Sequence, residues 1–87
     1  MKLLIIEDEP QASRRLQRQI RSLLPDATIL PTLSSVQGSV AYLSDHLQPD
    51  LIFMDIHLSD GDSFEILHQI EIDAPIIFTT AYDAYAL

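Results

Sequence analysis

Short apolar runs recur along the chain and predict the strands of a buried sheet. Lys2–Ile6, Asp50–Asp55 and Ile76–Thr80 are mainly apolar, and each ends at a polar residue or directly before one. Such runs are typical of strands covered on both faces, as in a parallel sheet. Ala27–Leu33 predicts a further strand, and Pro31 places it at a sheet edge because proline cannot donate to a strand ladder.

The segments between these runs predict helices. After Pro10, apolar residues recur at helical spacing until Pro25, at Leu16, Ile20, Leu23 and Leu24. Ser34 or Ser35 is expected to cap a second helix that ends at Gln48-Pro49 and turns inward Val36, Val40, Leu43 and Leu47. A short third helix carries Phe64, Leu67 and Ile70, and Ala81–Leu87 predicts the start of a fourth. This alternation indicates a single doubly wound α/β domain with a parallel sheet.

Composition narrows the range of partners. The net charge is −8, and all five cations lie near the start, at Lys2, Arg14, Arg15, Arg18 and Arg21. Phosphate backbones are bound mainly by Lys and Arg, so we expect no direct nucleic-acid binding by this segment. The chain has no cysteine, and no apolar run approaches the ~20 residues of a membrane span. We therefore expect a cytoplasmic protein that binds no membrane.

Acidic residues stand where buried strands end. Glu7 and Asp8 follow the first strand, and Asp55 closes the third. Ligands of such sheets bind beyond the carboxyl ends of the strands, and these carboxylates converge there if the first and third strands are neighbours. Two carboxylates ~5 Å apart repel by roughly 3 kcal/mol at an effective dielectric of 20, so a cation is a natural partner. Oxygen ligands favour Mg²⁺ or Mn²⁺.

The loop after the first strand argues against nucleotide cofactors. Phosphate-binding loops at this position are rich in glycine and present free backbone N–H groups. This loop reads "EDEP", and its charge repels phosphate. A dinucleotide, flavin or ATP site is therefore disfavoured.

Three separated motifs resemble the receiver domain of bacterial response regulators. They are "LLIIEDEP", "PDLIFMDIHLSDGDSFEIL" and "PIIFTTAYDAYAL", and together they extend over the whole chain in order. The wording "DIHLSDG" and the ending "TAYDAYAL" are most similar to receivers that precede LytTR-type DNA-binding output domains. The resemblance implies a flavodoxin/CheY-like fold with strand order 2-1-3-4, and a signalling domain, not an enzyme.

The resemblance also implies roles for single residues. A sensor histidine kinase would donate a phosphoryl group to Asp55 in a Mg²⁺-dependent reaction. Asp8 would bind Mg²⁺ directly, Glu7 mainly through a water, and His57 through its backbone carbonyl. Thr80 would hydrogen-bond the phosphoryl group; strand alternation alone leaves Thr79 as an alternative, and the family's Thr-Ala pair decides for Thr80.

The chain departs from the family pattern at its end. Receiver domains continue into a fifth strand, which carries a lysine that pairs with the phosphoryl group, and a fifth helix, whereas this sequence ends at Leu87. We therefore expect residues 1–87 to be a truncated receiver domain. Its exposed strand edge predicts self-association or strand exchange, and weakened phosphorylation.

Two other functions compete with the signalling acceptor. A phosphatase of the haloacid-dehalogenase kind would also use an Asp nucleophile, but it usually has a second Asp where this chain has His57. A fragment that is not phosphorylated and serves as a dimerisation module is the alternative favoured by the early end. Simpler roles are expected elsewhere: Glu9 begins a helix, and Asp60 and Asp62 serve the turn at Gly61.

Overall fold

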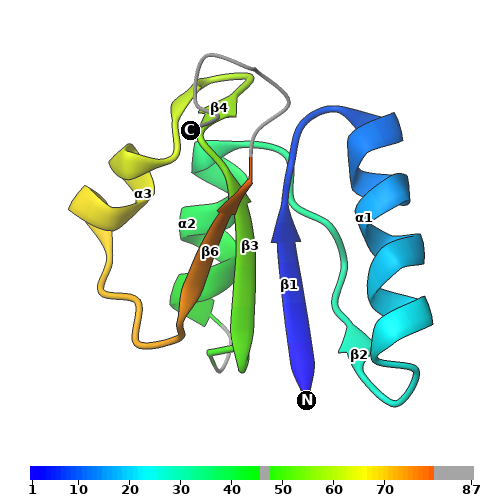
Figure 1. Ribbon diagram of the computed structural model, residues 1–87. Helices are drawn as coiled ribbons and strands as arrows, with labels where there is room; N and C mark the ends of the chain where they lie inside the picture. The colour runs from blue at the N-terminus through cyan, green and yellow to red at the C-terminus, as the bar shows by residue number, and fades with distance from the viewer. Residues whose placement is uncertain (46–47, 80–87) are drawn as a thin grey trace.

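A four-stranded parallel sheet forms the centre of the computed structural model, which describes residues 1–45 and 48–79 (Figure 1). Its order is β2-β1-β3-β6, with strands β1 Lys2–Ile6, β2 Thr28–Ile29, β3 Leu51–Asp55 and β6 Ile76–Thr79. The helices are α1 Pro10–Leu23, α2 Val36–Asp45 and α3 Phe64–Gln69. The expected α/β class and the order 2-1-3-4 are confirmed, with β6 as the fourth strand of the sheet.

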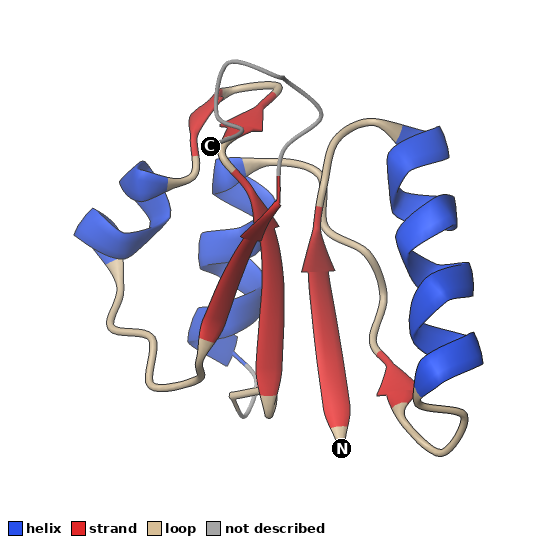
Figure 2. Ribbon diagram, in the orientation of Figure 1, coloured by secondary structure: helices blue, strands red, loops and turns tan. Residues whose placement is uncertain are grey.

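Helices cover both faces of the sheet, as Figure 2 shows. One core lies between the sheet and α2 and α3, and it contains Leu4, Ile6, Val36, Leu43, Ile52, Met54, Leu58 and Ile66. The other lies under α1 and contains Leu3, Ile5 and Ile20. Alternate residues of β1 enter opposite cores, which explains why the whole strand is apolar. Among the described residues, no helix has both the length and the apolar character needed to cross a bilayer.

Helix α1 begins and ends close to the predicted positions. Pro10 occupies its first turn, and the Glu9 carboxylate accepts hydrogen bonds from the N–H groups of Gln11 (3.1 Å) and Ala12 (2.7 Å). The last two apolar residues of the helical pattern are not buried, because Leu23 is 78% exposed and Leu24, which follows the helix, is 45% exposed. Helical periodicity gives the direction of a side chain around the helix axis, but it does not say how far the covering sheet extends.

The second strand is shorter than the predicted Ala27–Leu33. Only Thr28–Ile29 pair regularly with β1, although the N–H groups of Leu30 (2.9 Å) and Leu33 (3.0 Å) still donate to carbonyls of β1. Pro31 lies between these two donors and has no N–H of its own. The predicted edge position is therefore confirmed, and the proline accounts for the interruption of the ladder.

The segment after β3 contains a small hairpin where the sequence predicts a loop. Strands β4 His57–Leu58 and β5 Gly61–Asp62 pair antiparallel. Gly61 has φ +148°, a value that residues with a side chain rarely adopt. Leu58 is 8% exposed and belongs to the core under α2 and α3. A run of only two residues is too short for an alternating pattern, so the sequence does not reveal this hairpin.

Two fully buried serines allow a matched test of stability. The Ser63 hydroxyl has no hydrogen-bond partner among the described residues, whereas the Ser39 hydroxyl donates to the Ser35 carbonyl at 2.7 Å. We expect Ser63→Ala to raise the free energy of unfolding by about 1 kcal/mol, because it removes a desolvated, unpaired hydroxyl. Ser39→Ala loses a bond of similar value and gains about 0.5 kcal/mol of helix propensity, so it should not stabilise the chain.

Urea unfolding of both variants beside the wild type measures the difference. Equal stability changes in the two variants would contradict the assignment of Ser63 as an unpaired group.

Candidate functional site

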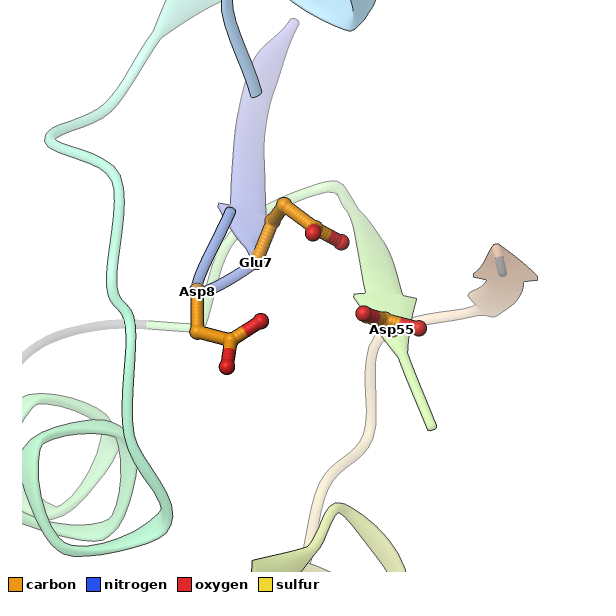
Figure 3. A group of neighbouring side chains, drawn as sticks. All are labelled: Glu7, Asp8 and Asp55. Carbon is orange, nitrogen blue, oxygen red and sulfur yellow. The ribbon is translucent and has the colours of Figure 1, made fainter. Parts of the chain in front are cut away.

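Parallel pairing of β1 with β3 brings three acidic side chains together. Ile6 lies opposite Met54, so the residues that follow each of them, Glu7 and Asp55, reach the same edge of the sheet. Carboxylate oxygens of Glu7, Asp8 and Asp55 all lie within 4.8 Å of one another. Figure 3 shows the three side chains directed toward a common space beyond the strand ends. The predicted convergence of these residues is confirmed.

Two of the three carboxylates are almost completely buried. Glu7 is 7% exposed and Asp55 is 3% exposed, while Asp8 is exposed. One oxygen of Asp55, Oδ1, is buried and has no hydrogen-bond partner among the described residues. Buried carboxylate oxygens are normally paired, because an unpaired one carries its full desolvation cost. An unpaired oxygen inside an acidic cluster is therefore a suitable ligand for a cation.

The cluster perturbs the titration of Glu7. Burial is the main cause that raises the pKa of Glu7 from 4.5 to about 7, and the neighbouring Asp55 raises it further through a side-chain hydrogen bond and charge repulsion. The Glu9 N–H, which donates to Glu7 at 3.2 Å, opposes this shift. Burial and the neighbouring Asp55 therefore favour the protonated form of Glu7 up to about pH 7.

Two surface cavities border the cluster and bring arginine side chains near it. A cavity of about 570 Å³ is lined by Glu7, by Thr79 at the end of β6, and by Arg14, Arg15 and Arg18 of α1. A second, of about 300 Å³, is lined by Glu7, Asp8, Arg14 and polar residues that include Ser13 and Thr32. Arg14 lines both cavities, so the acidic cluster has cationic side chains along its α1 side.

The other predicted site residues are placed less completely. His57 begins β4 with an exposed side chain, two residues after Asp55. Thr80 lies outside the described residues, and Thr79 pairs in register with Asp55. The expectation that Glu9 begins a helix is confirmed, since it caps α1.

Asp60, which the sequence predicts only as a turn residue, has a further role in the structure. The Asp60 carboxylate accepts hydrogen bonds from the N–H groups of Val36 (2.7 Å) and Gln37 (3.0 Å) at the start of α2. These bonds lower the pKa of Asp60 below its usual value of 3.8. Capping of a helix by a residue far along the chain leaves no local sequence signal, so the sequence could not reveal this role.

The acidic cluster suits a hard divalent cation. It offers only carboxylate oxygens, which Mg²⁺ and Mn²⁺ prefer, from two rigid strand ends and the loop beside them. The buried Oδ1 of Asp55, which has no hydrogen-bond partner within the described part of the chain, is one such oxygen.

Comparison with known proteins gives consistent relatives. The chain is 38% identical over its whole length to the sensory transduction protein LytT of Enterococcus faecalis, and 34% identical to the positive alginate biosynthesis regulatory protein of Pseudomonas aeruginosa. It spans 36% of the length of each, about a third. The expected similarity to LytTR-type regulators is confirmed, because a LytT protein is among these relatives.

Solved structures show the same fold. One is the N-terminal domain of a response regulator/sensory box/GGDEF 3-domain protein from Carboxydothermus hydrogenoformans. Its match covers 100% of this chain and 70% of the solved chain, with a TM-score of 0.80 and 27% identity. The MaeR response regulator bound to beryllium trifluoride matches with a TM-score of 0.80 at 19% identity, covering 94% of this chain and 68% of its own. The sequence model of the response regulator receiver domain family matches residues 3–87 of this chain. The chain therefore belongs to the response regulator receiver domain family.

Proposed function

We propose that this chain accepts a phosphoryl group on Asp55 in a reaction that depends on Mg²⁺. The observation that supports this most is the buried Asp55 carboxylate, which lies beside Glu7 and Asp8 and has one oxygen with no hydrogen-bond partner among residues 1–45 and 48–79. By relation to its family, the donor is a sensor histidine kinase. The regulated output is a LytTR-type DNA-binding domain, which lies outside this chain.

The metal would be held by Glu7, Asp8 and Asp55, with the backbone carbonyl of His57 as a further ligand. When bound, Mg²⁺ neutralises negative charge on the carboxylates and on phosphoryl oxygens. The rigid ends of β1 and β3 keep these ligands in place before the ion arrives, so little reorganisation is needed.

The transfer itself needs one nucleophile and correct positioning. An Asp55 oxygen attacks the phosphorus of the donor, a bond from that oxygen to phosphorus forms, and the bond from phosphorus to the donor's histidine nitrogen breaks. The products are an aspartyl phosphate and a free histidine. Thr80 would donate a hydrogen bond to the transferred group. Arg14, at the rim of the cluster, supplies positive charge where the anionic donor approaches.

A turnover enzyme is a weaker interpretation. Phosphatases with an Asp nucleophile usually place a second Asp two residues later, and this position holds His57, whose side chain is exposed. We therefore propose a signalling acceptor that is modified once, not a hydrolase.

Modification of the intact protein tests the proposal directly. After treatment with acetyl phosphate and Mg²⁺, we expect the mass of the chain to increase by one phosphoryl group, because Asp55 attacks phosphorus and acetate leaves. Asp55→Asn should abolish the increase. Asp62→Asn is the matched control, since it neutralises a nearby exposed carboxylate outside the cluster and should be modified like the wild type.

Intact-mass spectrometry with Mg²⁺ and with EDTA gives the readout. A phosphoryl group that is added in EDTA, or added to Asp55→Asn, would show that another residue is the acceptor.

The raised pKa of Glu7 predicts a pH effect on the metal-free chain. The folded state retains a proton on Glu7 up to about pH 7, whereas the unfolded chain releases it near its ordinary value of 4.5. The stabilisation that this proton provides is complete below the unfolded-state pKa of 4.5 and is lost as the pH rises through the folded-state pKa of about 7. We expect the free energy of unfolding to fall more between about pH 5 and about pH 8 in the wild type than in Glu7→Gln.

Urea unfolding at both pH values, without metal, measures this difference. Mg²⁺ competes with the proton, so its stabilising effect should grow as the pH rises through about 7. Identical pH dependence in the wild type and in Glu7→Gln would contradict a raised pKa at this position.

Self-association remains a prediction for this chain. Strand β6 pairs with β3 on one side, and among the described residues no strand pairs with its other edge. Its side chains Ile77 and Phe78 are 47% and 43% exposed. We expect dimers or larger species in light scattering at raised protein concentration, reduced by Ile77→Lys, because a charged edge resists strand pairing. A monomer at every concentration would contradict this expectation.

A further inference from the structure

Asp60 joins two parts of the molecule that are far apart in the sequence. It lies in the turn of the β4–β5 hairpin, and its two carboxylate oxygens accept separate hydrogen bonds from the N–H groups of Val36 and Gln37. Val36 is 24 positions away along the chain. Both oxygens of an exposed side chain are thus used at one helix start, where a negative charge is also favoured by the helix dipole.

The hairpin that carries Asp60 is fixed to the end of β3. Leu58 anchors it in the core, and the Ser63 N–H donates to the Ile56 carbonyl at 2.8 Å. Ile56 directly follows Asp55. A displacement of the hairpin therefore reaches Asp55 within a few bonds.

The start of α2 is likewise tied to Glu7. The Glu7 N–H donates to the Leu33 carbonyl at 2.8 Å, and the Leu33 N–H donates to the Ile5 carbonyl at 3.0 Å. Only two residues separate Leu33 from Val36. The Asp60 bonds consequently close a ring of short links that runs from Asp55 through the hairpin and the start of α2 to Glu7.

We propose that Asp60 is a positioning residue for the acidic cluster. It fixes the loop after Asp55 against the segment that holds Glu7, so that the spacing of the three carboxylates suits a divalent ion. The physical reason is that these carboxylates repel one another when they are ionised, and the Asp60 bonds hold the β4–β5 hairpin against the displacement that this repulsion favours. This inference rests on the proposed metal-dependent function.

A simple helix cap is the competing explanation, and the chain offers a matched control for it. The Ser35 hydroxyl accepts a hydrogen bond from the Gly38 N–H at 2.9 Å, so α2 also has a local cap. Ser35→Ala removes a cap from the same helix without touching the hairpin. Asp60→Ala removes the cap and both Asp60 bonds between the hairpin and α2, and leaves only the longer bond from the Ser59 hydroxyl to the Ser34 carbonyl at 3.4 Å. Asp60→Asn retains one acceptor oxygen if the alanine variant fails to fold.

The experiment compares the wild type with these variants by two-dimensional amide NMR, first without metal and then during a Mg²⁺ titration. We expect the metal-free amide signals of Glu7 and Asp55 to move in the Asp60 variants and to stay in place in Ser35→Ala. We expect Asp60→Ala to weaken Mg²⁺ binding roughly tenfold, at the lower end of the effect of outer-shell partners of metal ligands. Ser35→Ala should change it by at most about twofold.

Each outcome has one meaning for the inference. Equal effects of the Asp60 and Ser35 variants on the Glu7 and Asp55 signals, or no effect of either, would show that Asp60 is only a helix cap. A wild type that binds no Mg²⁺ would overturn the proposed function. In that case the metal-free signals would still decide whether Asp60 positions the cluster.

Discussion

Repulsion between the buried carboxylates of Glu7 and Asp55 is the interaction on which the design of this site depends. When both groups are ionised, above about pH 7, and their oxygens lie within 4.8 Å of each other, it amounts to roughly 3 kcal/mol at an effective dielectric of 20. The strand ends cannot separate to relieve it without uncovering Ile6 and Met54, which are fully buried. Exposing each such side chain costs about 1.5–3 kcal/mol. Burial behind the carboxylates therefore outweighs the repulsion between them, so the two strand ends stay side by side.

This balance explains why the sequence predicts so much of the fold and the site. The apolar runs that end in Glu7 and Asp55 are at once the evidence for the strands and the anchors of the acidic groups. The same adjacent residues determine where the strand forms, that it is buried and where the acidic group lies, so one local pattern predicts all three features. Parallel pairing then follows from the alternation of strands and helices, and it brings the strand ends to one edge of the sheet.

Features that depend on contacts between distant residues could not be predicted in the same way. Whether Leu23 is buried or exposed depends on what lies beside the last turn of α1, and helical spacing contains no information about those neighbours. The contact of Asp60 with Val36 arises only once the hairpin has folded against α2. Two-residue strands such as β4 are likewise too short to show a period. The motifs thus identify the acidic residues, whereas the details that set their geometry come from the folded chain.

The ends of the sheet strands hold residues of the cluster more firmly than the segments outside the sheet do. Asp55 ends β3 and Glu7 directly follows β1, and many buried contacts fix the position of both strands, so the loss of a single hydrogen bond changes it little. Asp8 lies in the loop after Glu7, and His57 begins the two-residue strand β4, which Leu58 anchors in the core. Their positions depend on fewer contacts, including single hydrogen bonds worth about 1 kcal/mol each. Repulsion within the cluster should therefore displace Asp8 and His57 and not the ends of β1 and β3. Cation binding would then order the loops around a pair of carboxylates that the sheet already holds in place.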